Sequence, residues 1–295
     1  MTLDLGLAIL IGLMIAATPL ILAALGELVV EKAGVLNLGV EGMMVMGAVA
    51  GFAIKITSGS YAIGFVGAMA AGVVLALLFG LLTQVLLSNQ VATGLALTLF
   101  GLGLSALIGQ GFSGKSAGTF PRLWPGGLDV LAALAIAMIP AVAWFLDRTR
   151  AGLVLRAVGE NHDAAHALGY PVVAVRMAAI AFGGAMAGLG GAYLSLVQTP
   201  FWVERMTAGR GWIALALVVF AAWRPTRLLV GAWLFGGITI MQLHGQGLGI
   251  KIDAQILSML PYLATIAVLV AISARQGAVR LAAPACLGKV FYAST

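Results

Sequence analysis

The chain has 295 residues, of which 62% are hydrophobic and 9% are charged, and its net charge is +6. A water-soluble protein of this size cannot bury so much apolar surface, so the composition excludes a soluble enzyme or binding protein and favours a protein that spans a bilayer. The basic excess does not indicate nucleic-acid binding, because the sequence has no basic run with interleaved aromatic residues.

Apolar segments recur along the whole chain. Lipid offers the backbone no hydrogen-bond partners, so we expect each crossing to be α-helical. The sequence predicts an all-α polytopic transmembrane helix bundle of about nine spans, within a range of eight to ten, that forms a single domain over residues 1–295. One segment is short for a crossing and predicts a tilted or broken helix, Trp212–Ala222. The other predicted spans are Leu5–Leu25, Leu36–Ile54, Tyr61–Leu87, Val91–Ile108, Leu128–Leu146, Met177–Val197, Leu228–Leu243 and Ala254–Ile272.

The link between the first two spans is unusually polar for a segment at membrane depth. Asn37 and Glu41 stand four residues apart, on one face of a helix, and Gly34, Gly39 and Gly42 predict that this helix is broken. A carboxylate inside a membrane is costly unless it is paired or hydrated. Two interpretations remain open: a polar kink that lines or gates a pathway, and a hydrogen-bonded knot that holds the helix against its neighbours.

Few other residues suit a polar pathway. Gln90 and Thr93 lie near a short cytoplasmic turn, and Phe100 and Trp212 are candidates to stack on a planar ligand. A run of small residues, Gly183–Gly191, lies inside the sixth span. Small side chains let helix backbones approach closely, so we interpret this run as a helix-packing surface.

The longest polar interval is the loop 147–176 between the fifth and sixth spans. Ala151–Gly169 is compatible with a helix, and acidic and amide residues around Asn161 suit a helix N-terminus. Gly169 before Tyr170–Pro171 predicts the helix end. We expect a short helix of roughly two turns outside the membrane, with small exposed residues that let a soluble partner approach.

Charge distribution predicts the orientation. With the loop 147–176 in the cytoplasm, segments on that side hold ten Lys and Arg residues and the outer segments hold six. Because basic residues are enriched on the cytoplasmic side, we expect the N-terminus outside and the C-terminus in the cytoplasm.

The sequence carries no motif for chemistry of its own. It has no nucleophile elbow, phosphate-binding loop or metal cluster. The single Cys286 excludes an intrachain disulfide, and the i,i+4 pair His162 and His166 lacks a third metal ligand. We expect this chain to have no catalytic site, no cofactor and no metal.

Three stretches resemble the permease subunits of bacterial ABC importers, in the branch that includes branched-chain amino acid, ribose-type sugar and nucleoside systems. They are EKAGVLNLGVEGMMVMG at 31–47, LRAVGENHDAAHALG at 155–169 and GRGWIALALVVFAAWRPTRLLVGAWLFGG at 209–237. Sugar and amino-acid branches usually carry an Asp-Leu-Ser type string where this chain has Asn37–Gly42, which favours the nucleoside branch. Ala283–Gly288 also resembles the tail of that branch, and the chain departs from it over 289–292.

The resemblance implies a heteromeric importer in the bacterial cytoplasmic membrane. Its partners would be a cytoplasmic ABC ATPase, which hydrolyses ATP, a second permease subunit, expected to be a different chain, and an extracytoplasmic substrate-binding protein. Glu160–Gly169 would be the coupling helix that docks on the ATPase. The residues implied in this coupling are Arg156, Gly159, Glu160, Asn161, Ala164, Ala165 and Gly169. The candidate residues of the substrate pathway are Asn37, Glu41, Gln90, Thr93, Phe100 and Trp212.

Nucleosides or related purine and pyrimidine compounds are the expected cargo. Simple sugars, riboflavin-like heterocycles and branched-chain amino acids are the alternatives within the same class. An ion-coupled secondary transporter is an alternative of another class, but it requires intramembrane charges and inverted repeats. Only Glu41 lies inside a predicted span and no clear internal repeat is visible. A membrane scaffold is a third possibility.

Overall fold

A computed structural model describes residues 2–123, 127–244, 259–260, 263–264, 266–267, 270 and 283–292 of the chain. Over these residues the regular structure is helical, in agreement with the all-α prediction. The helices are α1 (Thr2–Lys32), α2 (Val40–Ser58), α3 (Tyr61–Gly80), α4 (Gln90–Gly109), α5 (Val130–Arg148), α6 (Arg150–Glu160), α7 (His162–Ala167), α8 (Val172–Tyr193), α9 (Arg210–Phe220) and α10 (Pro225–His244). Short π-helical turns follow α3 and α8, namely η1 (Leu81–Val85) and η3 (Leu194–Gln198), and a 3-10 turn follows α4, η2 (Gln110–Phe112).

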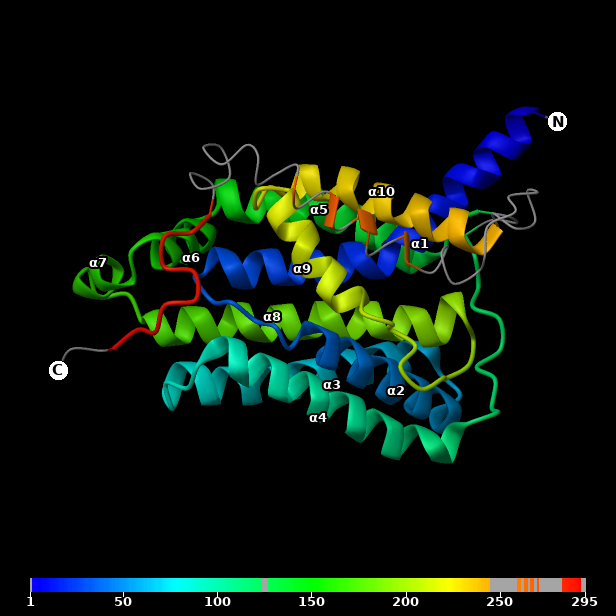
Figure 1. Cartoon of the computed structure of the whole chain (residues 1–295), viewed down its shortest axis with the longest axis horizontal. Coiled ribbons are helices and arrows are strands. Elements are labelled where there is room, and N and C mark those ends of the chain that lie inside the picture. The colour runs from blue at the N-terminus through cyan, green and yellow to red at the C-terminus, as the bar shows by residue number, and fades with distance from the viewer. Residues whose placement is uncertain are drawn as a thin grey trace.

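Six helical stretches of the described chain are long and apolar enough to cross a membrane, and they correspond to the first six predicted spans. Two later predicted spans are shorter apolar helices, Arg210–Phe220 and Pro225–Met241. Figure 1 shows α9 running obliquely across the bundle, as its short apolar sequence predicted. The ninth predicted span, Ala254–Ile272, lies largely outside the described residues. The fold is therefore a multi-span helical bundle, and the number nine stays a prediction.

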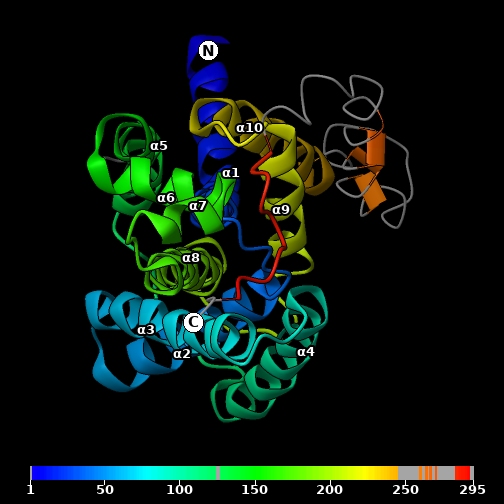
Figure 2. The same cartoon turned by 90° about the vertical axis from the view of Figure 1, so that its left-hand side faces the viewer.

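The helix α8 lies at the centre of the bundle, between α1 on one side and α2 with α3 on the other (Figures 1 and 2). Its small residues make this position possible. A Cβ atom on Gly183 would meet the Val30 side chain of α1, and one on Gly184 would meet the Ala76 side chain of α3. A Cβ atom on Gly191 would meet the Met44 carbonyl oxygen of α2. The predicted role of this glycine run in helix packing is confirmed.

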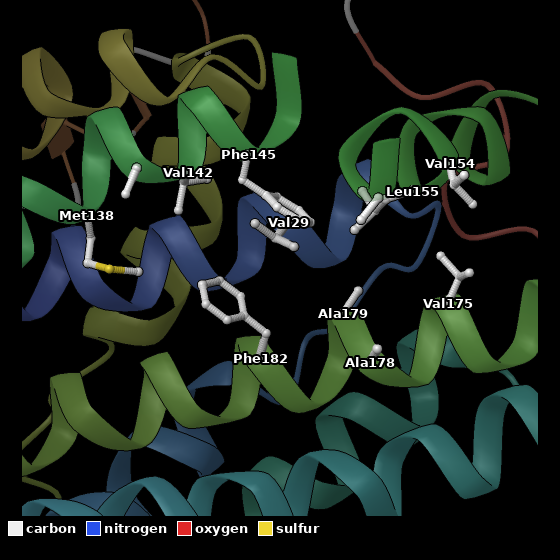
Figure 3. A pocket seen from close by; sticks show the side chains of 12 residues that line it. Val29, Met138, Val142, Phe145, Val154, Leu155, Val175, Ala178, Ala179 and Phe182 are labelled. Carbon is white, nitrogen blue, oxygen red and sulfur yellow. The ribbon is translucent and has the colours of Figure 1, made fainter. Parts of the chain in front are cut away.

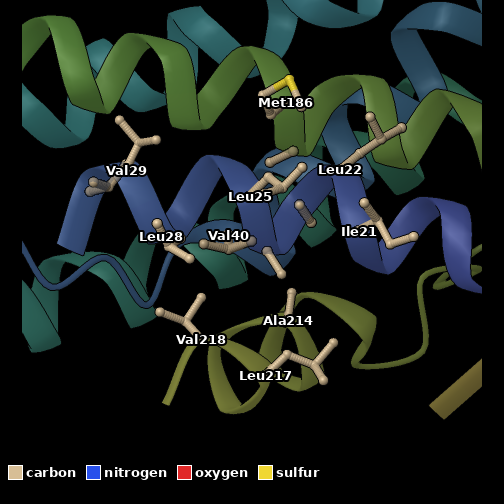
Figure 4. Packing of buried hydrophobic residues seen from close by; sticks show 14 of the residues in the cluster. Ile21, Leu22, Leu25, Leu28, Val29, Val40, Met186, Ala214, Leu217 and Val218 are labelled. Carbon is tan, nitrogen blue, oxygen red and sulfur yellow. The ribbon is translucent and has the colours of Figure 1, made fainter. Parts of the chain in front are cut away.

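Large apolar side chains fill the space around α1. Figure 4 shows α1 between α8 and α9, with Leu22 and Leu25 near Met186 and with Ala214 and Leu217 on the opposite side. These side chains are at most 5% exposed. Most of the first span is therefore covered by other helices of the protein, although α1 is long and apolar enough to cross a membrane.

The two ends of the bundle differ in what they carry. The helices α6 and α7 and the C-terminal segment 283–292 lie at one end, and the N-terminus lies at the other (Figure 1). The link 59–60 between α2 and α3 and the link 199–209 before α9 belong to the second end. We call the end with α6, α7 and the C-terminal segment the coupling end, because it contains the loop 147–176.

Asn161 separates α7, the short helix expected in that loop, from α6 before it. This residue has an extended backbone (φ −151°, ψ 94°) and its side-chain Oδ1 accepts a hydrogen bond of 3.0 Å from the Ala164 amide, which starts α7. Gly169, with φ +87°, ends the helical stretch in the left-handed conformation that glycine adopts easily. The start near Asn161 and the end at Gly169 were predicted correctly, while the separate helix α6 was not predicted.

Candidate functional site

The link between α1 and α2 folds back among the helices as a non-helical, largely buried segment, residues 33–39. The predicted break is present here, but it is an extended stretch rather than a kink within one helix. Non-helical backbone at this depth requires hydrogen-bond partners, because lipid provides none. Side chains of α1 and α4 supply these hydrogen-bond partners.

Asn37 and Glu27 satisfy one part of the segment. Glu27, on α1, accepts a hydrogen bond of 3.2 Å from the Asn37 amide through Oε1, and Asn37 accepts one of 2.9 Å from the Gly39 amide through Oδ1. The side chain of Asn37 is completely buried. Asn37 therefore holds its own backbone turn, as asparagine does in Asx turns, and prepares the start of α2.

Gln90 and Thr98 satisfy the other part from α4. Gln90 accepts a hydrogen bond of 2.8 Å from the Leu36 amide through Oε1, and the Thr98 hydroxyl donates one of 3.1 Å to the Leu38 carbonyl oxygen. Both polar side chains are buried. The α4 helix can come this close because residue 94 is a glycine. A Cβ atom at that position would lie only 2.8 Å from the Leu38 nitrogen.

Glu41 lies in the first turn of α2 and caps the N-terminus of α9. Its Oε1 accepts hydrogen bonds from the Thr207 hydroxyl at 2.6 Å and the Gly209 amide at 2.8 Å, and its Oε2 accepts one from the Gly211 amide at 2.6 Å. The side chain is only 3% exposed. A carboxylate is favourable beside the free N–H groups of a helix start. Of the two interpretations left open by the sequence, these contacts favour the hydrogen-bonded knot.

The start of α2 is thus held between α4 and α9. A Cβ atom on Gly42 would lie 2.8 Å from the Leu97 carbonyl oxygen of α4, and one on Gly211 would lie 2.5 Å from the Glu41 Cα atom. The two aromatic candidates, Phe100 on α4 and Trp212 on α9, are 52% and 47% exposed. They flank this contact on the bundle surface, unlike Asn37, Glu41 and Gln90, which are buried inside it. Thr93 is half-buried and shares a hydrogen bond of 2.8 Å with the Ser88 hydroxyl.

A second polar centre surrounds Arg176, at the start of α8. The guanidinium is completely buried and donates to the Ala33 carbonyl oxygen, the Gln84 Oε1 and the Lys289 carbonyl oxygen, each at 3.2 Å. Its Nη2 lies 3.0 Å from Nδ1 of His162 on α7. Sequence reasoning placed Arg176 in an exposed loop and missed this centre. A lone arginine directly before an apolar span was the one available signal.

Two acidic residues near the end of α1 are buried as well. The helix extends beyond the predicted end of the first span at Leu25, so Glu27 and Glu31 lie within it. Glu31 accepts a hydrogen bond of 2.6 Å from the Trp223 indole nitrogen. Both side chains of this hydrogen bond are buried, so Glu31 connects the end of α1 to the turn after α9.

The residues implied in coupling to an ATPase divide into an exposed group and a buried group. Gly159 packs against the Lys32 carbonyl oxygen at the end of α1, and Ala165 is buried among the Val158, Val172 and Phe291 side chains. Arg156 is half-buried, and its Nη1 lies 3.8 Å from Oδ1 of Asp147. The remaining implied residues are exposed on the outer face of the loop: Glu160, Asn161, Ala164 and Gly169.

A cavity of about 470 Å³ lies between α1, α5, α6 and α8 (Figure 3). Its lining is apolar, with Phe145 and Phe182 among the larger side chains and Val29, Leu155 and Val175 around them. A site for a polar solute needs a few convergent polar groups. We therefore do not assign this cavity to cargo. In the described part of the chain, no three His, Cys, Asp or Glu side chains come together as metal ligands would.

The contact between α7 and Arg176 is expected to weaken as the pH falls below about 6.5, the ordinary pKa of histidine. Burial lowers the pKa of His162, and the Arg176 and Lys289 charges lower it further, although Asp163 acts in the opposite direction. An undocked α7 then binds the proton more readily than the docked one. The docking free energy is complete above the undocked pKa and decreases as the pH falls through it toward the docked value.

Hydrogen exchange of the α7 amides at pH of about 7.5 and about 5.5 measures this effect. We expect faster exchange at the lower pH in the unmodified chain and no such difference in His162→Gln. His166→Gln, at an exposed position on the same helix, is the control and should retain the difference. A pH response that survives in His162→Gln would contradict the assignment to this side chain.

Comparison with known proteins agrees with the sequence motifs. Residues 9–272 match the family described as "Branched-chain amino acid transport system / permease component". The chain is 44% identical to a putative glucose ABC transporter permease of Haloferax volcanii, over 92% of this chain and 93% of the relative. It is 32% identical to a nucleoside ABC transporter permease of Lactococcus lactis, over 88% and 90%, and 30% identical to a guanosine ABC transporter permease of Bacillus subtilis, over 90% and 92%. This chain belongs to the branched-chain amino acid transport system permease family of ABC transporters.

Proposed function

We propose that this chain is the transmembrane permease subunit of an ABC importer for nucleosides or related purine and pyrimidine compounds. The observation that carries the proposal is the folding of the 31–47 motif. Its polar residues fix the non-helical segment 33–39 and the start of α2 between α4 and α9. The two nucleoside permeases aligned over about nine-tenths of the chain support the same cargo.

The charge distribution of the described chain supports a cytoplasmic coupling end. Eight Lys and Arg residues belong to that end and five to the other. This bias is the one expected when the loop 147–176 faces the cytoplasm and the N-terminus lies outside. The basic residues of the coupling end are Lys32, Arg148, Arg150, Arg156, Arg176, Arg224, Arg227 and Lys289. Those of the other end are Lys55, Lys115, Arg122, Arg205 and Arg210.

In the proposed mechanism, a cytoplasmic ATPase hydrolyses ATP and drives motion of the exposed part of the 147–176 loop. The centre around Arg176 passes that motion to α8 and to the segment 33–39, because Arg176 donates to the Ala33 carbonyl oxygen. Segment 33–39 leads directly into α2, whose first turn binds both α4 and α9. Displacement of that turn would shift α4 relative to α9, which lie on either side of it, and switch access from outside to inside.

We place the solute pathway on this α4–α9 surface, facing a second permease subunit that is expected to be a different chain. Phe100 and Trp212 provide exposed aromatic faces there, which suit a planar nucleobase. Two buried polar atoms around the segment 33–39, Glu27 Oε2 and Gln90 Nε2, make no hydrogen bond within the described chain. They retain capacity for a polar solute or for water. An extracytoplasmic binding protein would deliver the solute.

Simple sugars are the second candidate cargo, supported by the 44% identity to a putative glucose permease. Branched-chain amino acids have less support, because the Glu41 carboxylate is occupied by three donors and offers no free charge to a zwitterion. A nucleoside and a sugar share the sugar ring and lack net charge. The planar base is the part that distinguishes them.

The test is uptake by the complete complex in liposomes. With the ATPase and binding protein reconstituted, we expect ATP-dependent accumulation of labelled guanosine that an uncoupler does not inhibit. Accumulation of labelled glucose instead would replace the nucleoside with the sugar. Uptake that stops on addition of the uncoupler would support an ion-coupled transporter and refute the proposal.

Gly169→Trp is expected to uncouple ATP hydrolysis from uptake while the permease still inserts and assembles. Gly169 is exposed with φ +87°, and a Cβ atom there would meet nothing within 4 Å, so the indole projects from the α7 end toward the partner. Gly59→Trp is the matched control, because Gly59 has φ +75°, equally free space and a position at the other end of the bundle. The two substitutions carry a similar backbone cost of ~1 kcal/mol. The ratio of ATP hydrolysed to solute imported should rise for Gly169→Trp alone.

Glu160→Arg reverses an exposed charge beside α7 and should have the same effect as Gly169→Trp. Within the described residues its carboxylate accepts a long hydrogen bond of 3.4 Å from the Ala285 amide and lies close enough to Lys32 to interact with its charge. Normal uptake by both Glu160→Arg and Gly169→Trp would refute the docking of this loop on the ATPase.

A further inference from the structure

We propose that Arg176 and the C-terminal segment 283–292 form a clamp that fixes α7 and the end of α6 to the bundle, and that the clamp positions these coupling elements during transport. The inference rests on the proposed function, since it names the residues through which ATPase-driven motion enters the membrane helices. None of these residues contacts solute in this scheme. They are positioning residues.

The C-terminal segment binds both sides of the joint. The Cys286 amide donates a hydrogen bond of 2.9 Å to the Gly159 carbonyl oxygen of α6, and the Gly288 amide donates one of 3.1 Å to the Gly34 carbonyl oxygen after α1. Through backbone bonds, the segment therefore links the coupling loop to the beginning of the segment 33–39. The Cys286 thiol adds a weaker contact of 3.4 Å to the Glu160 carbonyl oxygen.

The same segment also holds α7 with an aromatic side chain. Phe291 is buried, and its ring centroid lies 5.3 Å from that of His162 and 5.3 Å from that of His166, in edge contacts. It packs with Val158 of α6 and Val172 of α8 in one small apolar cluster. Phe291 thus contacts side chains of three helices, α6, α7 and α8. This is the region where the sequence departs from the tail that the nucleoside branch carries.

Arg176 ties the clamp to α8. Its bonds to Ala33, Gln84, Lys289 and His162 reach four separate parts of the chain: the end of α1, the turn after α3, the C-terminal segment and α7. Only arginine has donors enough, in a fixed planar fork, to serve all four at once. Movement of α7 relative to α8 would have to break or carry these bonds with it.

A cavity interrupts the packing of α6 against the membrane helices. The apolar cavity of about 470 Å³ lies between α6 and the membrane helices, with Ala151, Val154 and Leu155 of α6 on its wall. A hollow of this size removes close packing, which is what makes an interior resist deformation. The clamp therefore connects the loop to the bundle where the packing beneath α6 is interrupted, in addition to the close contacts of Gly152 with α5 and of Gly159 with the end of α1. Val154 of α6 and Val175 of α8 are among the side chains around this cavity (Figure 3).

The test compares variants of the complete complex in liposomes by the ratio of ATP hydrolysed to solute imported. Arg176→Gln and deletion of residues 283–295 are each expected to raise this ratio about tenfold, a typical size for coupling between sites. Arg176→Lys retains the charge but not the fork, so an intermediate ratio is expected. Arg150→Gln is the matched control, since Arg150 is an exposed arginine in the same loop, and it should leave the ratio unchanged.

A second readout needs no cargo. Deletion of 283–295 should speed hydrogen exchange of the α7 amides in the permease alone, while amides of α8 near Gly184 stay protected. Unchanged coupling in both Arg176→Gln and the deletion variant would overturn the clamp. Failure of the deletion variant to assemble would also overturn it, because the segment would then be a folding element. Absence of ATP-driven import by the unmodified complex would refute the proposed function instead, and the exchange measurement would still decide whether the clamp exists.

Discussion

Gly191→Ala is expected to prevent stable folding of the permease, although it adds a single methyl group. The added Cβ atom would overlap the Met44 carbonyl oxygen and would also lie within 3.0 Å of the Ala48 nitrogen, both in the backbone of α2. Backbone atoms cannot rotate away as a side chain can, so α2 and α8 would have to separate along their contact. Overpacking of this kind costs about 1–3 kcal/mol and more where the neighbours cannot move.

Gly103→Ala is the matched control and should have the opposite sign. Gly103 lies on an exposed face inside α4, and a Cβ atom there would meet nothing within 4 Å. Replacement of a free helical glycine by alanine stabilises a helix by about 0.5–1 kcal/mol. Thermal stability of the purified permease, followed by the fraction that stays monodisperse after heating, measures both variants. Equal behaviour of the two would mean that α8 does not need its glycine at 191.

The central packing and the membrane spans were predictable because both depend on neighbouring residues. Each of the first six spans is a continuous run of apolar residues in the sequence, and Gly183–Gly191 lies within one such run. The start of α7 was less clear. Asn161 suits a helix N-terminus, and it indeed caps α7, but the sequence did not show that the same residue ends α6.

The candidate site depends on contacts between residues far apart in the chain, and this is why the sequence left it open. Glu41 bonds Thr207 and Gly211, which lie 166 and 170 residues away. No local pattern distinguishes a carboxylate that caps a distant helix from one that faces a pathway. The same reason explains the burial of Arg176, which requires a C-terminal segment 113 residues farther along the chain.

Gly159 and Ala165 illustrate a related limit. Their small size predicted a surface that a partner can approach, but small size serves equally well to let two parts of one chain approach each other. Gly159 lies against the end of α1, and Ala165 lies under Phe291. The exposed residues Ala164 and Gly169 keep the predicted character of the outer surface. Their role in docking an ATPase stays a prediction.

Glu41→Ala is expected to destabilise the permease by several kcal/mol and to abolish uptake. The substitution leaves three buried donors without an acceptor, namely the Thr207 hydroxyl and the Gly209 and Gly211 amides, and each such group costs about 1–3 kcal/mol. It also removes a negative charge from the N-terminus of α9, where the helix dipole favours one. Glu41→Gln retains one acceptor oxygen and should have a smaller effect in the same direction.

Glu204→Ala is the control, because Glu204 is an exposed carboxylate in the same link before α9 and should leave stability unchanged. Thermal unfolding and uptake, measured on the same variants, decide between the two interpretations of Glu41. If Glu41 holds α2 against α9, Glu41→Ala lowers the unfolding temperature and the uptake together. Thr207→Val then has a milder effect on both, because it removes one hydroxyl donor and leaves no buried donor without an acceptor. If Glu41 gates the pathway instead, Glu41→Ala loses uptake while its unfolding temperature stays that of the unmodified chain, and the knot would be refuted. The three short bonds to one carboxylate, from Thr207 and Gly209 at the end of the link and from Gly211 in α9, argue for the first result.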